Sequence, residues 1–359
     1  MNSILNFNGK VPKFLFSDSL WNQNYLHRLG CEYSDEIQSI IRSSREMVKE
    51  FHCNFTISYF GFIPEVNEIL GHKGWICFDN NVYQRKFIEL MTREEYEELI
   101  WNPLEFIKNK AIFRLYKNTA PENLVEAYKE FNAKNESNYM AQKLLKEKYQ
   151  INHLYLDIIT SPLDVLGDFF RGTKNLLMDM HNCPDLVKEA ANSLVDFCYE
   201  KALYNKRQFD NAVIMPLHIP SILSTRDFTN FFFPSFHKLI QKLLQDDFII
   251  LIMLEGKVER LLDKFFEINS PKVIFHFEED IPAIVKEKMN ENNLISGFFP
   301  VHLLKYGTEE ECISYAVKLL HIFKGKKYIF TTNKVIYSPT EVNIDKLRVV
   351  YQYVEEYGK

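Results

Sequence analysis

Imidazole and carboxylate side chains stand at or directly after apolar runs in the second half of this 359-residue chain. His218 and Glu255 each follow such a run, and His276 lies near the end of a third. These are the side chains that most often act as general acids and bases near neutral pH. We therefore take Glu255, His218 and His276 as candidate catalytic residues. The alternative interpretation is structural: a histidine packed at a strand end, or an acid that favours the start of a helix through its dipole.

A second pattern could hold a metal ion. His276, Glu278 and Asp280 alternate along the chain, so in a strand their side chains share one face. An imidazole and two carboxylates on one face are suitable metal ligands. The same acids also precede Pro282, and carboxylates are common just before a proline in the first turn of a helix. Metal binding and helix capping both stay open at this point.

Four further charged residues could contact a substrate. Asp168 and Arg171 lie about one helical turn apart, so they either pair with each other or leave the guanidinium free for a carboxylate or phosphate. Arg114 has the same two interpretations. Lys334 could act as a base if it is buried, and is otherwise a solvated loop residue. The candidate substrate-binding residues are thus Arg171, Arg114, Asp168 and Lys334.

The elements that must position these residues follow a regular order after about residue 150. Continuously apolar runs of strand length alternate with longer helical segments, which is typical of strands buried on both faces of a parallel sheet. The runs are His153–Ile159, Ala212–Ile219, Phe248–Leu254, Lys272–Phe277, Leu294–Phe299 and Tyr328–Thr332. This order predicts an α/β fold, a (β/α)8 TIM barrel, in which reacting groups lie at the C-terminal ends of the strands.

Residues 1–150 are expected to add N-terminal helices and the first barrel strands. The amphipathic stretch Asp35–Phe51 and the capping-box pattern Thr92–Glu95 predict helices. Short strands are expected at Phe55–Phe60 and Trp75–Phe78. Because no Pro/Gly/Ser-rich linker divides the chain, we expect one domain over residues 1–359, with the regular βα units in residues 151–359.

Composition and charge limit the kinds of partner and the cellular location that we expect for this chain. The formal net charge is −5 and Lys/Arg runs are absent, so nucleic acid is not an expected partner. The longest apolar run, Phe248–Leu254, is far shorter than the about 20 residues of a membrane-spanning helix. The six cysteines are scattered, as is typical of reduced thiols. We expect a cytoplasmic protein that acts on a small molecule and does not bind membranes.

Several segments occur in the same order as in a known family. They are Met91–Ile100, Asn102–Pro103 with Arg114, Ser161–Met180, Leu254–Lys257, Leu303–Glu311, and Glu341–Asn343 with Glu356–Gly358. Over nearly the whole chain they resemble the uroporphyrinogen decarboxylase family, a superfamily that includes methylcobalamin:coenzyme M and other corrinoid methyltransferases. The resemblance implies a (β/α)8 barrel with its active site at the C-terminal face. Its members decarboxylate porphyrinogens or move methyl groups to or from corrinoids, and the barrels often pair as homodimers.

The departures from the family pattern are informative. The H-x-C-G zinc motif of the methyltransferase branch falls on Met253–Gly256, and the late cysteine falls near Asn333-Lys334. Thioether and ammonium groups cannot replace imidazole and thiolate on zinc, so the family zinc site is expected to be lost. The arginine-rich segment of the decarboxylase branch falls on Lys10–Lys13. Few cations then remain for a substrate with many carboxylates.

Three functions follow from these residues and this resemblance. The first is corrinoid-linked methyl transfer to or from a small molecule, in an anaerobe, with a corrinoid protein as partner and no covalently bound cofactor. Glu255, His218 and His276 would handle protons, and Arg171 would anchor an anionic group. The second is a lyase of porphyrin metabolism that decarboxylates uroporphyrinogen or another tetrapyrrole. The third is a non-catalytic protein that binds a corrinoid protein or a tetrapyrrole.

Overall fold

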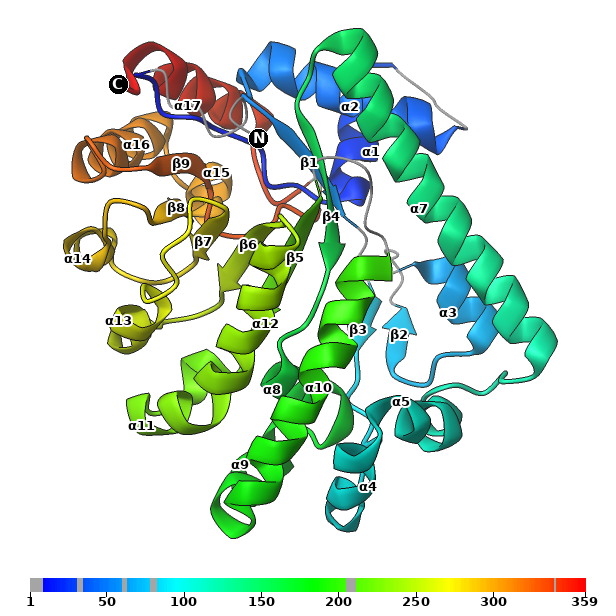
Figure 1. Ribbon diagram of the computed structural model, residues 1–359. Coiled ribbons are helices and arrows are strands. Elements are labelled where there is room, and N and C mark those ends of the chain that lie inside the picture. The colour runs from blue at the N-terminus through cyan, green and yellow to red at the C-terminus, as the bar shows by residue number, and fades with distance from the viewer. Residues whose placement is uncertain (1–8, 31–34, 60–62, 78–82, 205–210, 339) are drawn as a thin grey trace.

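Seven parallel strands form one curled sheet. The computed structural model describes residues 9–359 except 31–34, 60–62, 78–82, 205–210 and 339. The strands are adjacent in the order β1-β4-β5-β6-β7-β8-β9 (Figure 1). Their bounds are β1 Thr56–Tyr59, β4 His153–Ile158, β5 Ala212–Leu217, β6 Ile249–Leu254, β7 Val273–Phe277, β8 Leu294–Phe299 and β9 Tyr328–Thr332. The six strands predicted in the second half of the chain are therefore confirmed.

An extended N-terminal segment occupies the place between β9 and β1. Lys13 forms a parallel bridge to Phe330, and Ser17 forms one to Ile336 just beyond β9. On the other side the backbone N–H of Asn54, directly before β1, donates to the carbonyl oxygen of Lys13 at 2.8 Å. The segment thus connects the two outer strands of the sheet, and the fold is a TIM-like barrel.

Side chains of successive strand residues alternate between two apolar cores. One core lies inside the barrel and includes Ile214, Leu251 and Ile274, together with Phe14 and Phe16 from the N-terminal segment. The other core lies between the outer face of the sheet and the surrounding helices. Burial on both faces is the physical reason that each strand is continuously apolar rather than alternating.

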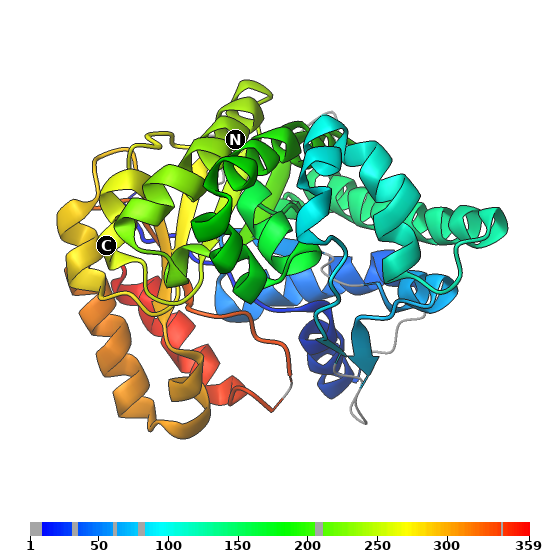
Figure 2. The ribbon, with the colours of Figure 1, turned by 90° about the horizontal axis from the view of Figure 1, so that it is seen from below.

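Helices surround the barrel. Their bounds are α1 Ser19–Arg28, α2 Glu36–Phe51, α3 Pro64–Leu70, α4 Tyr96–Trp101, α5 Pro103–Phe106, α6 Ile112–Leu115, α7 Pro121–Tyr149, α8 Pro162–Val165, α9 Thr173–Asn182, α10 Pro184–Tyr204, α11 Thr225–Asp227, α12 Phe233–Gln245, α13 Leu262–Phe265, α14 Pro282–Lys288, α15 Val301–Tyr306, α16 Glu309–Ile322 and α17 Ile344–Tyr357. Figure 2 shows the ring of helices from the end at which α4 and α9 lie, with the long α7 projecting to one side. None of the helices in the described part of the chain is long and apolar enough to cross a lipid bilayer.

The N-terminal predictions were right in part. Asp35 accepts a hydrogen bond from the first turn of α2, and Thr92 and Glu95 form the predicted capping box. The strand expected at Trp75–Phe78 does not join the barrel: β2 (Trp75–Cys77) pairs antiparallel with β3 (Tyr83–Arg85) in a separate hairpin, and Phe78 lies outside the described residues. A short apolar run does not reveal its pairing partner, and the barrel position is taken by the N-terminal segment instead.

Candidate active site

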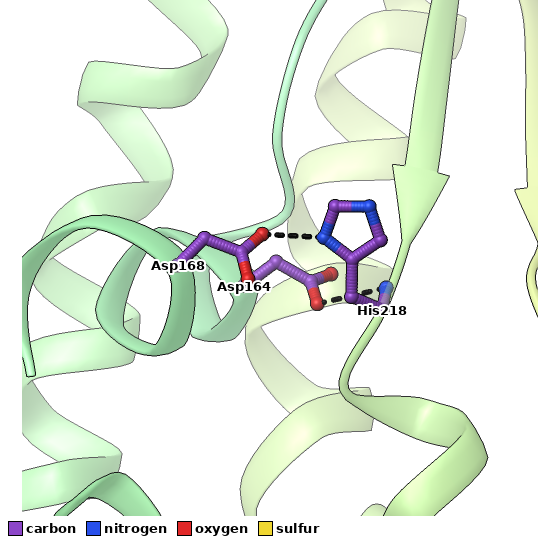
Figure 3. Close-up of side chains that lie close together, drawn as sticks. All are labelled: Asp164, Asp168 and His218. Carbon is purple, nitrogen blue, oxygen red and sulfur yellow. Dashed lines mark hydrogen bonds and ion pairs between the residues drawn. The ribbon is translucent and has the colours of Figure 1, made fainter. Parts of the chain in front are cut away.

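His218 lies at the C-terminal end of β5 with a carboxylate on each side of its ring. Nδ1 is 2.6 Å from Oδ2 of Asp168, and Nε2 is 3.4 Å from Oε2 of Glu255, which follows β6. Figure 3 shows the imidazole pointing toward Asp168. Asp168 belongs to a single π-helical turn, Leu166–Phe170, a local distortion that is frequent at functional sites. The His218 side chain keeps 45% of its surface exposed, so a ligand can reach it.

The two carboxylates keep this imidazole charged. Hydrogen bonds to Asp168 and then to Glu255 raise the pKa of His218 to about 11 despite partial burial. At neutral pH the ring is therefore an imidazolium with an N–H on both nitrogens. In this state it can donate a proton or stabilise negative charge, whereas a basic role would first require the loss of a proton.

Asp164, which was not predicted from the sequence, holds the backbone at His218 in place. Its Oδ1 accepts hydrogen bonds from the backbone N–H groups of His218 (3.1 Å) and Ile219 (2.8 Å), and its Oδ2 accepts one from the hydroxyl of Ser161 (2.6 Å). The residue is completely buried. Burial, followed by the nearby charge of Asp168, raises its pKa to about 7. The available signal was the spacing Ser161-x-x-Asp164, a capping-box pattern, but that pattern does not reveal a contact with His218, 54 positions later in the chain.

Asp164→Ala should lower the free energy of unfolding by about 2–4 kcal/mol, because buried donors without an acceptor cost about 1–3 kcal/mol each. Asp164→Asn, which keeps one acceptor oxygen, should lose clearly less. Urea unfolding measures both, and equal stability of Asp164→Ala and the natural protein would contradict the structural role.

The pKa of Asp164 also predicts the pH dependence of that stability. The folded-state pKa lies above the ordinary value of 3.8, so the contribution of this group is complete below pH 3.8 and is lost as the pH rises through about 7. Asp164→Asn should remove this part of the pH dependence.

Asp164, Asp168 and His218 also have the spacing of a metal site, with one ligand atom from each within 4.8 Å of the others. Both oxygens of Asp164 already accept hydrogen bonds, and the His218 ring is cationic in this setting. The observed contacts are those of a hydrogen-bond network that holds the imidazole in place.

Hydrogen bonds also connect the ends of the next strands. Oε2 of Glu278 accepts from the backbone N–H of Gly256 at 3.1 Å and lies 3.6 Å from Nζ of Lys334. The side-chain amide of Asn333 donates to the carbonyl oxygen of Glu278 at 3.1 Å. Gly256 has a positive φ of 71°, which lets the chain turn sharply beside Glu255. Glu255, Glu278 and Lys334 thus lie at strand ends on the same side of the barrel as His218.

His276 lies inside the barrel, beneath the strand ends that carry His218 and Glu255. It is completely buried, with Nδ1 3.1 Å from the Ser296 hydroxyl, Nε2 2.9 Å from the carbonyl oxygen of Asn333, and its ring against Phe16. Burial lowers its pKa to about 4, so the ring is neutral at pH 7. Because Nε2 faces a carbonyl, it carries the proton. The two ring nitrogens are engaged with protein groups rather than directed at the opening.

The three residues considered for a metal have separate contacts. His276 contacts Ser296 and Asn333, and Glu278 contacts Gly256, as described above. Oδ1 of Asp280 accepts from the backbone N–H of Val258 at 2.8 Å. The side chains of His276, Glu278 and Asp280 therefore connect neighbouring strand ends and do not converge on one point.

Arg171 is buried in an ion pair. Its Nε is 2.7 Å from Oδ2 of Asp179, and its Nη1 donates to Glu89 and to the carbonyl oxygen of Met91. The pairing with Asp168 considered from the sequence is not formed. Instead, Arg171 connects the segment after β3, through Glu89 and Met91, with Asp179 of α9.

Arg114 has a similar structural partner. It forms two hydrogen bonds with the carboxylate of Glu95, at 2.7 and 2.8 Å, and a third with the carbonyl oxygen of Leu90. The guanidinium lowers the pKa of Glu95 to about 2. Arg114 therefore stabilises the capping box at the start of α4, and its guanidinium is not directed at His218.

A cavity of about 560 Å³ opens beside His218. Asp168, Arg171 and His218 line it, so three of the residues selected from the sequence meet at one cavity. Phe87 and Lys174, which the sequence did not single out, line it as well. The size is in the range of small-molecule sites, about 300–1,000 Å³.

The fold and this site define an α/β barrel with a charged imidazole at the C-terminal ends of its strands. Residues 117–357 match the uroporphyrinogen decarboxylase (URO-D) family, and the chain belongs to that family. No curated protein matches the chain in sequence.

Solved structures share the fold at low sequence identity. A methyltransferase from Methanosarcina mazei superposes with a TM-score of 0.65 at 12% identity, covering 99% of this chain and 97% of that one. A B12-independent methionine synthase from Shewanella sp. W3-18-1 has a TM-score of 0.45 at 10% identity, with 96% of each chain covered. A putative B12-independent methionine synthase from Listeria monocytogenes has a TM-score of 0.43 at 12% identity, with 98% and 97% covered. The first of these likenesses supports the barrel fold.

Proposed function

We propose that this chain is an enzyme that transfers a methyl group between a small molecule and a corrinoid carried by a partner protein, with His218 as the acid. The observation that carries the proposal is the imidazolium of His218, held between Asp168 and Glu255 at the edge of an open cavity. Membership of the URO-D family and the fold shared with a protein named as a methyltransferase support this class of reaction.

The proposed role of His218 is to deliver a proton to the leaving atom. When a methyl group leaves a nitrogen, oxygen or sulfur atom for a nucleophilic acceptor, the methyl–heteroatom bond breaks and its electron pair stays on the heteroatom. The proton on Nε2 of His218 then neutralises that atom. The corrinoid supplies the nucleophile when the partner protein is bound, and the barrel excludes water and orients the donor.

Asp168 and Glu255 have different proposed roles on the two sides of the His218 ring. The short contact between Asp168 and Nδ1 keeps that N–H in place and fixes the ring orientation. The contact between Glu255 and Nε2 is longer, so a substrate can displace it more easily. Displacement removes one cause of the high pKa and brings the pKa of His218 closer to neutrality, where proton transfer is efficient.

The residues at the zinc-motif positions do not fit zinc. The side chain of Met253 is buried inside the barrel, and Nζ of Lys334 lies 3.6 Å from both Glu278 and Glu279. Zinc takes thiolate, imidazole and carboxylate ligands, and an ammonium group beside the carboxylates repels a divalent cation. The proposed reaction therefore has no step through zinc.

Decarboxylation of a porphyrinogen is the weaker proposal. A substrate with many carboxylates needs several cations to offset its charge. The three cations considered for this role are each already paired: Arg114 with Glu95, Arg171 with Asp179, and Lys334 with Glu278. These pairs leave little positive charge to hold such a substrate.

The test mixes the purified chain with reduced cobalamin and a panel of methylated thiols, amines and ethers, and follows the absorption spectrum of the cobalt. We expect a spectral change that needs both the enzyme and at least one methyl donor. A spectrum that never changes, together with carbon dioxide release from uroporphyrinogen, would establish the lyase instead. Tight tetrapyrrole binding without either reaction would establish a binding protein.

A further inference from the structure

We propose that the cavity beside His218 binds a small aromatic carboxylate, with the ring of the ligand against Phe87 and its carboxylate at Lys174. This inference deepens the proposed function, on which it rests for the statement that the ligand is the substrate. Binding itself is independent of the chemistry. The inference is carried by the cavity, by the one cation in its lining that lacks an acidic partner in the described structure, and by the exposed aromatic ring.

Two of the three cations in the cavity lining already have two acidic partners each. His218 is paired with Asp168 and Glu255, and Arg171 is paired with Asp179 and Glu89. Lys174 is exposed, and in the described part of the chain it has no acidic partner. The ammonium group of Lys174 can therefore pair with the carboxylate of an entering ligand.

The same cavity has an aromatic wall. Phe87 keeps 41% of its surface exposed, and its ring lies against Gly172, where a Cβ would be only 2.8 Å from two ring atoms. Gly172 has a positive φ of 74°. The lack of a side chain at Gly172 lets the Phe87 ring lie close to the backbone there, and Phe87 lines the cavity. Exposed aromatic faces favour stacked or edge-on contact with a second ring.

The positions of Asp168 and His218 in the cavity lining set the orientation of the ligand. Asp168 and His218 line the cavity together with Phe87 and Lys174. A ligand that places its carboxylate at Lys174 and its ring on Phe87 can present a further substituent to the imidazolium. A volume of about 560 Å³ accommodates a substituted single ring.

Isothermal titration calorimetry on the full chain tests this with three probes. Benzoate has both the ring and the charge, benzamide has the ring alone, and acetate has the charge alone. We expect benzoate to bind about three- to tenfold more tightly than benzamide, as for a charge-assisted contact that is partly exposed, and acetate to bind more weakly than either. The advantage of benzoate should shrink at high salt.

Two substitutions assign the contacts, each with a matched control. Lys174→Gln should abolish the advantage of benzoate over benzamide, whereas Lys129→Gln, at an exposed lysine of α7, should keep it. Phe87→Leu should weaken both benzoate and benzamide about two- to tenfold, whereas Phe113→Leu, at an exposed phenylalanine of α6, should change neither. Phe87 and Lys174 are exposed, and an unchanged thermal midpoint verifies that the variants are folded.

Equal affinity for benzoate and benzamide, no heat with either at millimolar concentration, or full binding by both variants would each overturn the inference. The outcome is separable from that of the proposed function. Benzoate binding without any methyl transfer leaves the cavity assignment standing and removes the methyltransferase. Methyl transfer without benzoate binding does the reverse.

Discussion

His218→Asn is expected to lower the rate of methyl transfer by about 100- to 10,000-fold, the usual contribution of a positioned general acid. Asparagine keeps a hydrogen-bond donor of similar size but carries neither the charge nor the transferable proton of the imidazolium. His237→Asn, at a histidine of α12 whose ring contacts Gln241 and Phe233, is the matched control and should keep the full rate. Steady-state rates of both variants measure the effect, and a His218→Asn enzyme with the natural rate would remove the proposed acid.

The pH dependence of kcat/KM distinguishes a general acid at His218 from a histidine that only packs in the structure. Since the pKa of His218 is about 11, the free enzyme should keep its acid through neutral pH and lose it as the pH rises through about 11. Asp168→Asn removes the largest cause of the raised pKa, so the alkaline limb of kcat/KM should move to lower pH. A limb that stays in place would mean that another group is responsible for it.

The same pKa predicts a trend in stability. The folded-state pKa of His218 lies above the ordinary value of 6.5. Its contribution to folding is therefore complete below pH 6.5 and is lost as the pH rises through about 11. Urea unfolding as a function of pH should show this loss in the natural protein and not in His218→Asn.

Arg171→Met should cost about 2–4 kcal/mol of stability, near the lower end of the range for breaking a buried ion pair. Arg171 and Asp179 are only 6% and 3% exposed, so the carboxylate left behind is almost completely shielded from water. The hydroxyl of Tyr96 still donates to Asp179 at 3.1 Å, which moderates the loss. Urea unfolding measures the change.

Two further variants make the comparison specific. Asp179→Leu combined with Arg171→Met should recover part of the loss, because no unpaired charge then remains buried. Arg114→Met should cost less than Arg171→Met, since Arg114 is one-third exposed and its pair with Glu95 is partly solvated. If Arg171→Met left stability intact and raised KM alone, Arg171 would be the anion anchor expected from the sequence.

The sequence alone was sufficient to predict the barrel fold and the positions of its later strands. A strand buried on both faces must be continuously apolar, and that property is local, so the runs from β4 to β9 could be read directly. Helix starts were local as well: Asp35 and Thr92 accept hydrogen bonds from residues two or three positions later. The family resemblance followed from the order of short segments along the chain.

Contacts between distant segments could only come from the tertiary structure. The short apolar run at Trp75 pairs with β3, while an N-terminal segment with no strand signature lies between β9 and β1. Asp164 accepts hydrogen bonds from the backbone at the end of β5. Arg171 pairs with Asp179 and not with Asp168, which is nearer in the sequence. Hydrogen-bonding and ionic partners are chosen by geometry in three dimensions, and residue type and local spacing do not contain that information. The sequence thus determined which side chains could do chemistry, and the folded barrel decided which of them meet.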